Sequence, residues 1–520
     1  MSLTEKGEEI IKYASFLRER PTLNDQKERI YAELADIVGK DDISDSLVDL
    51  LIYNGFKVGG LAARLPKTQT TMVLADYVVH PETIEEVQRI VRVANRYKIP
   101  IVPVSGGTGP GHNPVYGGIV MDLKKLCRII EIDETSCTTT VETGIFVHVL
   151  ETELNRRGYE LEHRPASYWC ACVGGFIGDR SAGRLSTKYG KIEHMVIGMK
   201  IVLPNGEVFQ TPPVPGHAAG PDLNHLFIGA GGTLGIAVEA TLRIYPIPEK
   251  RIFRSFLFPT LHNAFEAIRK VMQADLRPCM ARLYDPIETK SQLFELLITK
   301  KTAKRIKEKK GCAYLVLGFD GFRDFVDLSD KKALEICLKD KAEDLGLEEG
   351  QFFWDHSLDD YYPGIERPSR TSEFFPDGSV HVGSVYDYSV PMKYIETVWE
   401  ETSKEIKKRW KDSIMYGHFS HWYREGTMMY PMTYVWNLPD DPKELALAED
   451  ELRSIVVRTA MKYGGTFQHH HGVGGGGVWA YGKYMPEQWG QWGFWLLYQI
   501  KKAIDPNNIM NPGMIGFEAL

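Results

Sequence analysis

Three glycine-rich stretches, at 105–111, 174–183 and 229–235, constrain the fold more than any other feature of the chain. Glycine has no Cβ, so such stretches let backbone N–H groups approach an anion closely. The first joins two apolar segments typical of buried strands, "IPIVPV" and "GGIVMDL". It neither matches G-x-G-x-x-G nor opens a helix, so a Rossmann site is not indicated. One such stretch alone is typical of a turn. Together the three indicate one extended diphosphate ligand held by backbone amides.

Around these stretches the chain alternates between helix-like and strand-like segments. After Pro81, apolar residues recur at helical spacing, at Ile84, Val87, Ile90, Val91 and Ala94. We expect strands at 138–144, 195–211 and 235–248, the middle one turning back as a hairpin at Asn205–Gly206, and later strands at 281–285 and 312–321. Further helices are expected at 260–275, at the lysine-rich stretches 299–310 and 331–345, and ahead of "DPNN" near the C-terminus.

Length and charge narrow the classes of protein. At 520 residues the chain is long enough for two or three domains, and its net charge of -7 argues against a nucleic-acid partner. No apolar run approaches the roughly 20 residues that span a bilayer. The charged N-terminus has no apolar signal core. The seven cysteines form no disulfide framework, and Cys170 and Cys172 are the one close pair. We therefore expect reduced thiols and a cytoplasmic protein.

Four blocks of the first half carry a family resemblance: "PVSGGTG", "PASYWCACVGGFIGDRSAG", "YGKIEHMVIGMKIVLPNGEV" and "GPDLNHLFIGAGGTLGIAVEATLRI". They resemble the FAD domain of the p-cresol methylhydroxylase/vanillyl-alcohol oxidase superfamily. The resemblance implies an α+β chain with a two-part FAD-binding domain and an α+β substrate (cap) domain built on an antiparallel sheet. The implied divisions are a helical lead-in (1–55), the FAD-binding domain (56–248), the cap domain (249–485) and a C-terminal segment returning to the FAD domain (486–520).

The resemblance also implies FAD as the cofactor. Gly231 stands where the family commonly has an acidic residue, which removes one polar contact and leaves the backbone path intact. Thr108 stands where one branch attaches flavin through a histidine, and His112 lies further along, so we expect non-covalent FAD. The implied cofactor-binding residues are Pro103, Val104, Ser105, Gly106, Gly107, Thr108, Gly109, Pro165, Ala166, Ser167, Gly174, Gly175, Gly178, Asp179, Arg180, Ser181, Gly232, Thr233, Leu234, Gly235 and Ile236.

The second half most resembles alkyl-dihydroxyacetonephosphate synthases and their bacterial relatives. The matching motifs are "ARLYD" (281–285), "SHWYREGTMMY" (420–430), "HHHGVG" (469–474) and "DPNNI" (505–509). By that resemblance Arg282 and Arg370 bind an anion or the substrate, Tyr430 is an acid–base tyrosine, and His469, His470 and His471 form an active-site run. His418 stands where the family has an arginine, so we place it with the substrate-binding residues.

Three uses of the histidine run are open: a metal site, hydrogen bonding inside a strand, or catalysis. On an extended strand His469 and His471 would face one way and His470 the other. No Cys, Asp or Glu stands at zinc spacing from the run, so we expect no metal. An imidazole with an ordinary pKa near 6.5 suits proton transfer, so catalysis is the favoured use. Tyr430 would need a cationic neighbour to ionise, or it is a core aromatic.

The expected function is that of an FAD-dependent dehydrogenase or oxidase. Its substrate would be a small molecule, either a hydroxy acid or a hydrophobic or aromatic alcohol. The run is followed by "GGGVWAYG", where the synthases continue with basic residues, and this loss of charge argues against a phosphorylated substrate. Two alternatives stay open: a synthase-type transferase that uses a flavin adduct, and a flavoprotein subunit serving an electron-transfer partner. We expect a homodimer.

Overall fold

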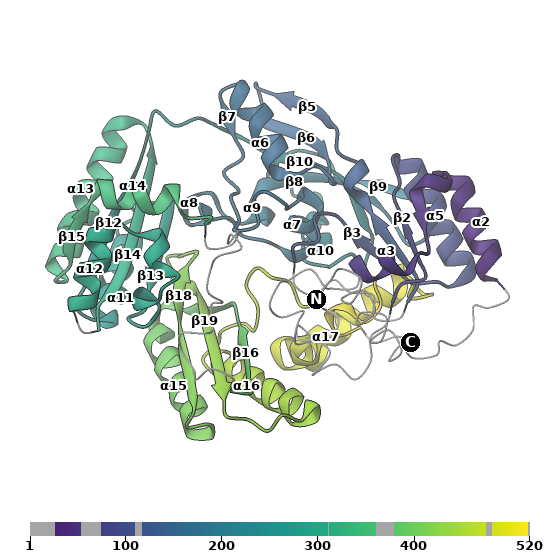
Figure 1. Ribbon diagram of the computed structural model, residues 1–520. Coiled ribbons are helices and arrows are strands. Elements are labelled where there is room, and N and C mark those ends of the chain that lie inside the picture. Colours follow the sequence, from purple (N-terminus) through teal and green to yellow (C-terminus); the bar gives the residue numbers. More distant parts are fainter. Residues whose placement is uncertain are drawn as a thin grey trace, which may run out of the picture.

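The computed structural model describes residues 26–53, 74–109, 117–309, 311–359, 379–474 and 481–517. The first half of the chain carries two sheets and the second half one large sheet, and the two halves lie side by side (Figure 1). The last long helix, α17 (Met485–Ile504), lies against the first half, and its first turn is also ion-paired to α16 (Pro442–Lys462) of the second half through Arg458 and Glu487.

The first sheet has the order β1-β2-β4-β3. Its strands are β1 (Ile43–Ser44), β2 (Tyr77–Val79), β3 (Ile101–Val104) and β4 (Ile119–Asp122). β4 pairs in parallel with both β2 and β3, and all its residues are buried. Helices α2 (Lys27–Val38), α3 (Leu47–Ile52) and α5 (Ile84–Tyr97) accompany this sheet. α5 begins where Thr83 accepts the N–H of Glu86, just after the expected Pro81 start.

The second sheet has the order β5-β6-β10-β8-β9 and is antiparallel. Its strands are β5 (Ile129–Asp133), β6 (Thr138–Glu142), β8 (Val196–Val202), β9 (Val208–Gln210) and β10 (Ile236–Arg243). The β8–β9 hairpin turns at Gly206, which adopts φ 82° as predicted for such a turn. A two-stranded ribbon joins β7 (Tyr159–Glu160) to β11 (Tyr245–Pro246). Helices α6 (Val147–Arg156), α7 (Val173–Asp179), α8 (Ser186–Tyr189), α9 (Ile192–Met195) and α10 (Asn224–Phe227) fill the connections.

The sheet of the second half is antiparallel, with the order β15-β12-β14-β13-β18-β19-β16 and with β17 also paired to β19. Its strands are β12 (Lys250–Phe258), β13 (Met280–Tyr284), β14 (Ala313–Gly321), β15 (Glu343–Gly346), β16 (His381–Val385), β17 (Tyr388–Pro391), β18 (Ser413–Ser420) and β19 (Gly426–Trp436). The helices packed on it are α11 (Leu261–Gln273), α12 (Lys300–Glu308), α13 (Arg323–Lys339), α14 (Leu347–Asp355), α15 (Ile395–Arg409) and α16 (Pro442–Lys462). The mixed helix and sheet content and this antiparallel sheet confirm the predicted α+β class.

Three local expectations were wrong. The glycine-rich stretch at 174–183 is not a simple loop, because α7 takes up its first part. The lysine-rich stretch at 331–345 is the end of α13 followed by strand β15. The histidine run is a succession of bends outside any strand. In each case a contact made far away in the sequence overrides the local pattern.

The C-terminal segment is fastened to the first half by a buried cation. Lys501, in α17, donates to the carbonyl oxygens of Thr233 (2.9 Å) and Met510 (2.8 Å) and pairs with Asp505 at 2.5 Å. Met510 in turn lies opposite Ile101 of β3. The ammonium group therefore ties α17 to the third glycine stretch.

Replacing Lys501 by Met should destabilise the protein by about 3 kcal/mol, because Asp505 would stay buried without its cation. Thermal unfolding followed by circular dichroism measures this, and FAD should be released at a lower temperature. The exposed neighbour Lys502, changed to Met, is the matched control and should unfold as the wild type does. Equal melting of both variants would show that the buried pair does not fasten the segment.

Candidate functional site at the junction of the two halves

The three glycine stretches meet in space. A Cβ added to Gly106, in the first stretch, would lie 2.4 Å from the carbonyl oxygen of Cys170, just before the second stretch. A Cβ on Gly232, in the third stretch, would lie 2.5 Å from Cγ of Pro103, just before the first stretch. A Cβ on Gly175, in the second stretch, would lie 3.5 Å from Oγ of Ser105, in the first. A side chain at Gly106 or Gly232 would prevent this packing, in which the three stretches lie together.

This junction forms a cradle that fits a diphosphate. The backbone N–H groups of Gly106, Gly107 and Thr108 have no hydrogen-bond acceptor within the parts of the chain that the structure describes. Gly107 adopts φ 61°, which turns successive N–H groups toward a common side. A row of such donors suits an anion. These residues would hold the FAD diphosphate.

Other predicted cofactor residues surround the cradle. Residues 166–170 form turns, and Ser181 Oγ lies 2.9 Å from His163 Nε2. The N–H of Gly231 donates to Gly178, so the third stretch is fastened to the end of α7. The side chains of Leu234 and Ile236 belong to the core. They can serve a cofactor only through their backbone. His112 lies outside the described residues.

The histidine run wraps around one buried carboxylate. The backbone N–H groups of His469, His470 and His471 all donate to Oδ2 of Asp387, at 3.2, 2.7 and 3.2 Å. Asp387 lies between β16 and β17 and is fully buried. Nδ1 of His470 lies 3.0 Å from Oδ2 of Asp387, and Nδ1 of His471 lies 3.0 Å from Oδ1. A nest of successive N–H groups on an anion replaces the expected strand, so the imidazoles do not alternate.

The charges within this cluster are strongly coupled. Burial alone would raise the pKa of the Asp387 carboxyl, yet His471 and His470 hold it well below its usual range. Burial lowers the pKa of His470 to about 4, and the neighbouring His471 adds to the shift. Burial also opposes charge on His471, but Asp387 outweighs it and raises the pKa of His471. Burial holds the pKa values of His469 and His421 well below their usual range. Asp387 is therefore ionised at neutral pH, and within the run His471 binds a proton most readily.

Tyr430 stands beside this cluster on β19. Its ring lies at 5.7 Å from the ring of His471, in an edge-on arrangement, and at 4.7 Å from the ring of His418, stacked at 10°. His418 is the cross-strand partner of Tyr430 on β18. The structure thus brings the predicted tyrosine, His418 and the histidine run together.

Arg282 reaches the same place from β13. Its Nη2 lies 2.9 Å from Nε2 of His418, whose Nδ1 lies 3.1 Å from both carboxylate oxygens of Glu288. Since Glu288 accepts the Nδ1–H, Nε2 of His418 is the acceptor for the guanidinium. His418 was predicted to bind substrate. Both ring nitrogens of His418 already have partners, Glu288 and Arg282, so His418 is placed to position Arg282.

The histidine run also touches the first half of the chain. Gly472 adopts φ 72°, and a Cβ there would lie 2.4 Å from Oδ1 of Asp179, at the end of α7. Buried Lys191 donates from Nζ to the carbonyl oxygen of His469 at 2.5 Å. The acid–base cluster of one half is therefore seated on the glycine-rich half.

Sequence reasoning missed four groups of this site: Asp387, Glu288, His421 and Ser186. Asp387 carried a signal, because a lone carboxylate in the strand-like "SVYDYSVP" is a polar group in an apolar setting. Glu288 acquires its partner His418 by packing within the second half, and Ser186 and His421 meet through the packing of the two halves. Arg370, a predicted anion-binding residue, lies outside the described residues.

Known proteins share both halves of this chain. A family model described as an FAD binding domain matches residues 75–212, and one described as FAD linked oxidases, C-terminal domain, matches residues 247–515. In the part of the chain that the structure describes, no helix has the length and apolar character needed to cross a bilayer.

Three curated relatives cover most of the chain. Alkyldihydroxyacetonephosphate synthase of Dictyostelium discoideum is 27% identical over 460 residues, which is 84% of this chain and 72% of that protein. The uncharacterised FAD-linked oxidoreductase YgcU of Escherichia coli K12 is 29% identical over 460 residues, covering 86% and 90%. Glycolate oxidase subunit GlcD of Bacillus subtilis is 26% identical over 488 residues, covering 92% and 95%.

Solved structures share the fold. An alkyldihydroxyacetonephosphate synthase superposes with a TM-score of 0.75 at 24% identity, covering 95% of this chain and 86% of that one. A p-cresol methylhydroxylase with bound substrate superposes with a TM-score of 0.71 at 18% identity, covering 96% and 98%. These superpositions confirm the predicted fold, and the two family matches confirm FAD as the cofactor.

Proposed function

Because this chain belongs to the family of FAD-linked oxidases, we propose that it is a dehydrogenase or oxidase that converts a small hydroxy acid to a keto acid. The observation that supports this most is a buried carboxylate, Asp387, that holds His471 beside Tyr430, where the run meets the first half at Asp179. An alcohol carbon that is oxidised loses a hydride, and its hydroxyl oxygen loses a proton. Bound FAD supplies the hydride acceptor, a chemistry that side chains lack.

His471 is the proposed base for the hydroxyl proton. Its Nδ1 faces Asp387 at 3.0 Å, so Nε2, on the opposite side of the ring, would take the proton. The ionised Asp387 would stabilise the imidazolium that forms, and the three N–H donors hold that carboxylate in place. Tyr430, at the edge of the His471 ring, would hydrogen-bond the substrate oxygen.

Arg282 supports an acid as the substrate. A guanidinium oriented by His418 and Glu288 can pair with a carboxylate through two parallel hydrogen bonds. Trp422 and Tyr481 are aromatic residues of the second half that could have lined a site for an aromatic substrate. Both are fully buried in the core, so they do not line such a site. This favours a hydroxy acid over an aromatic alcohol.

Anaerobic mixing with candidate substrates tests the proposal. The FAD-loaded protein would be mixed with glycolate, each enantiomer of lactate, benzyl alcohol and an acyl dihydroxyacetone phosphate, and its flavin spectrum recorded. We expect lasting bleaching by a hydroxy acid. If the acyl ketone phosphate alone perturbs the spectrum, without lasting reduction, the chain is a synthase-type transferase and the proposal is wrong. Readmission of oxygen separates an oxidase from a dehydrogenase.

Replacing Tyr430 by Phe should lower the rate of flavin reduction roughly 100-fold with unchanged FAD content, because the substrate oxygen loses one hydrogen bond in the transition state. Stopped-flow absorbance measures the rate. Tyr434, on the same face of β19, is the matched control, and its change to Phe should leave the rate unaltered. An unchanged rate for Tyr430→Phe would remove this residue from the mechanism.

The second electron acceptor, either oxygen or an electron-transfer protein, is part of this proposal. Non-covalent attachment of FAD, the homodimer and the cytoplasmic location remain predictions.

A further inference from the structure

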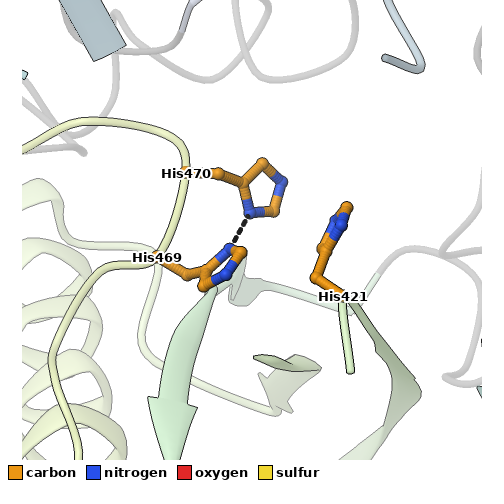
Figure 2. Close-up of side chains that lie close together, drawn as sticks. All are labelled: His421, His469 and His470. Atoms are coloured by element: carbon orange, nitrogen blue, oxygen red, sulfur yellow. Dashed lines mark hydrogen bonds between the residues drawn. The ribbon is translucent and has the colours of Figure 1, made fainter. Parts of the chain in front are cut away.

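Two buried histidines, His421 and His469, and the largely buried His470 converge beside the proposed base. His421 and His469 stack at 5.2 Å between ring centroids, and His470 lies at 5.0 and 5.2 Å from them (Figure 2). One ring nitrogen of each lies within 4.8 Å of a ring nitrogen of the other two. These groups come from two segments, the turn after β18 and the run held by Asp387.

The backbone fixes all three in place. His421 adopts φ 53°, a left-handed conformation that only tight surroundings maintain for a residue with a side chain. His469 and His470 are adjacent, and their N–H groups are anchored on one carboxylate oxygen of Asp387. The strand geometry that spoke against a metal does not exist here, and the third imidazole comes from outside the run.

Each imidazole has an oxygen partner for one of its nitrogens. Nδ1 of His421 lies 2.5 Å from Oγ of Ser186, and Nε2 of His469 lies 2.8 Å from Oη of Tyr423. Nδ1 of His470 lies 3.0 Å from Asp387. This is the outer arrangement typical of metal-binding histidines, in which one nitrogen donates to an oxygen and the other carries the lone pair.

We propose that His421, His469 and His470 bind a divalent transition-metal ion of the zinc class. Three protein ligands leave a fourth position for water or a substrate oxygen, as in catalytic zinc sites. Nδ1 of His470 faces Asp387 and also shares a 3.0 Å hydrogen bond with Nδ1 of His469, so Nε2 is the nitrogen that His470 offers to an ion. Binding would break the hydrogen bond between the two Nδ1 atoms and free Nδ1 of His469. Two nitrogen ligands of a tetrahedral zinc ion are about 3.3 Å apart, given bonds of about 2.0 Å. Ring nitrogens of the three histidines lie within 4.8 Å of one another, so the ion would draw the rings together.

The surrounding charges balance a cation. Lys191 lies under His469 and opposes a second positive charge. Glu193 lies 3.4 Å from Lys191 Nζ and 3.1 Å from Nε of Arg180. Asp387 contacts both His470 and His471. A dication bound by three neutral imidazoles would therefore lie beside the Asp387 carboxylate, whose charge it would share with His471.

Metal analysis of the untagged, FAD-loaded protein tests this site without any substrate, so it is independent of the proposed function. The protein would be stripped with a chelator, given zinc chloride and passed through a desalting column. We expect about one zinc ion per chain by mass spectrometry. With cobalt chloride in place of zinc chloride, the absorption bands of a tetrahedral cobalt site should appear at wavelengths longer than the flavin absorbance.

The variants His469→Gln and His421→Asn should each weaken zinc binding roughly 100-fold or more, with the flavin spectrum unchanged. Asn tolerates the left-handed backbone of position 421, so that variant keeps its fold. His225→Ala, at an exposed histidine of α10, is the control and should bind zinc as the wild type does. Substoichiometric zinc in the wild type, or full retention of zinc by both site variants, would overturn the proposal.

Discussion

The variant Asp387→Asn should oxidise a hydroxy acid at least 1,000-fold more slowly than the wild type, with only partial loss of stability. Asn presents either a carbonyl oxygen or an NH₂ group to the three N–H donors, and neither carries the negative charge that attracts His471. His471 would lose both its orientation and the stabilisation of its protonated form. Misplacement of a base by an altered acceptor costs roughly 10⁴ in rate in the well-studied serine proteases, which sets the scale.

Stopped-flow absorbance measures the rate of flavin reduction by this variant. FAD content and melting temperature are measured on the same preparation. Asp330→Asn is the matched control: Asp330 is a largely buried carboxylate that pairs with Arg254 at 2.8 Å, on a helix away from the histidines. It should lower stability and leave the reduction rate of the folded enzyme intact. Comparable rates for Asp387→Asn and Asp330→Asn would mean that Asp387 serves the fold and not the chemistry.

The variant Gly106→Ala should fail to retain FAD. Its Cβ would meet the carbonyl oxygen of Cys170 at 2.4 Å and the N–H of Cys172 at 2.9 Å, both backbone atoms that cannot move independently. The first glycine stretch would be pushed away from the second, and the N–H groups of Gly107 and Thr108 would no longer converge. We expect FAD content after gel filtration to fall more than about tenfold, since a cradle of aligned donors is lost.

Gly158→Ala is the matched control, because its Cβ would meet nothing within 4 Å and the residue lies in an exposed turn outside the cradle. Alanine is strained at its φ of 82°, so this variant should lose roughly 1 kcal/mol of stability and still keep its FAD. FAD retention by Gly106→Ala at wild-type level would place the diphosphate elsewhere. The absorbance ratio at 450 and 280 nm gives the answer directly.

The sequence predicted the cofactor half better than the acid–base cluster, for a physical reason. Where a Cβ would collide with its surroundings, the sequence must carry glycine, and such glycines are visible in the sequence, as at Gly106 and Gly232. His418 and Tyr430 were each singled out by motif resemblance, and the structure shows that they are cross-strand partners in one hairpin. These features are local or nearly so.

The carboxylate under the histidine run could not be found in the same way. Between Asp387 and the run lie helix α15, strands β18 and β19 and helix α16, and nothing in the pattern at 469–471 indicates an anion. The assumption that three successive residues lie on a strand gave the wrong directions for their imidazoles. A nest of N–H groups forms only when an anion is supplied from elsewhere in the fold, so its partner is visible in the structure alone. Ser186 and His421 meet for the same reason, across the two halves.

The central claim is that the Asp387-held histidine serves the removal of a hydride from a hydroxy acid. The most direct measurement compares anaerobic flavin reduction by a saturating hydroxy acid carrying hydrogen or deuterium on its hydroxyl-bearing carbon. We expect lasting reduction of the flavin, at a rate that is clearly lower with deuterium, because breaking that carbon–hydrogen bond is the redox step. Absence of reduction by every hydroxy acid, with a lasting spectral change only from an acyl ketone phosphate, would contradict it.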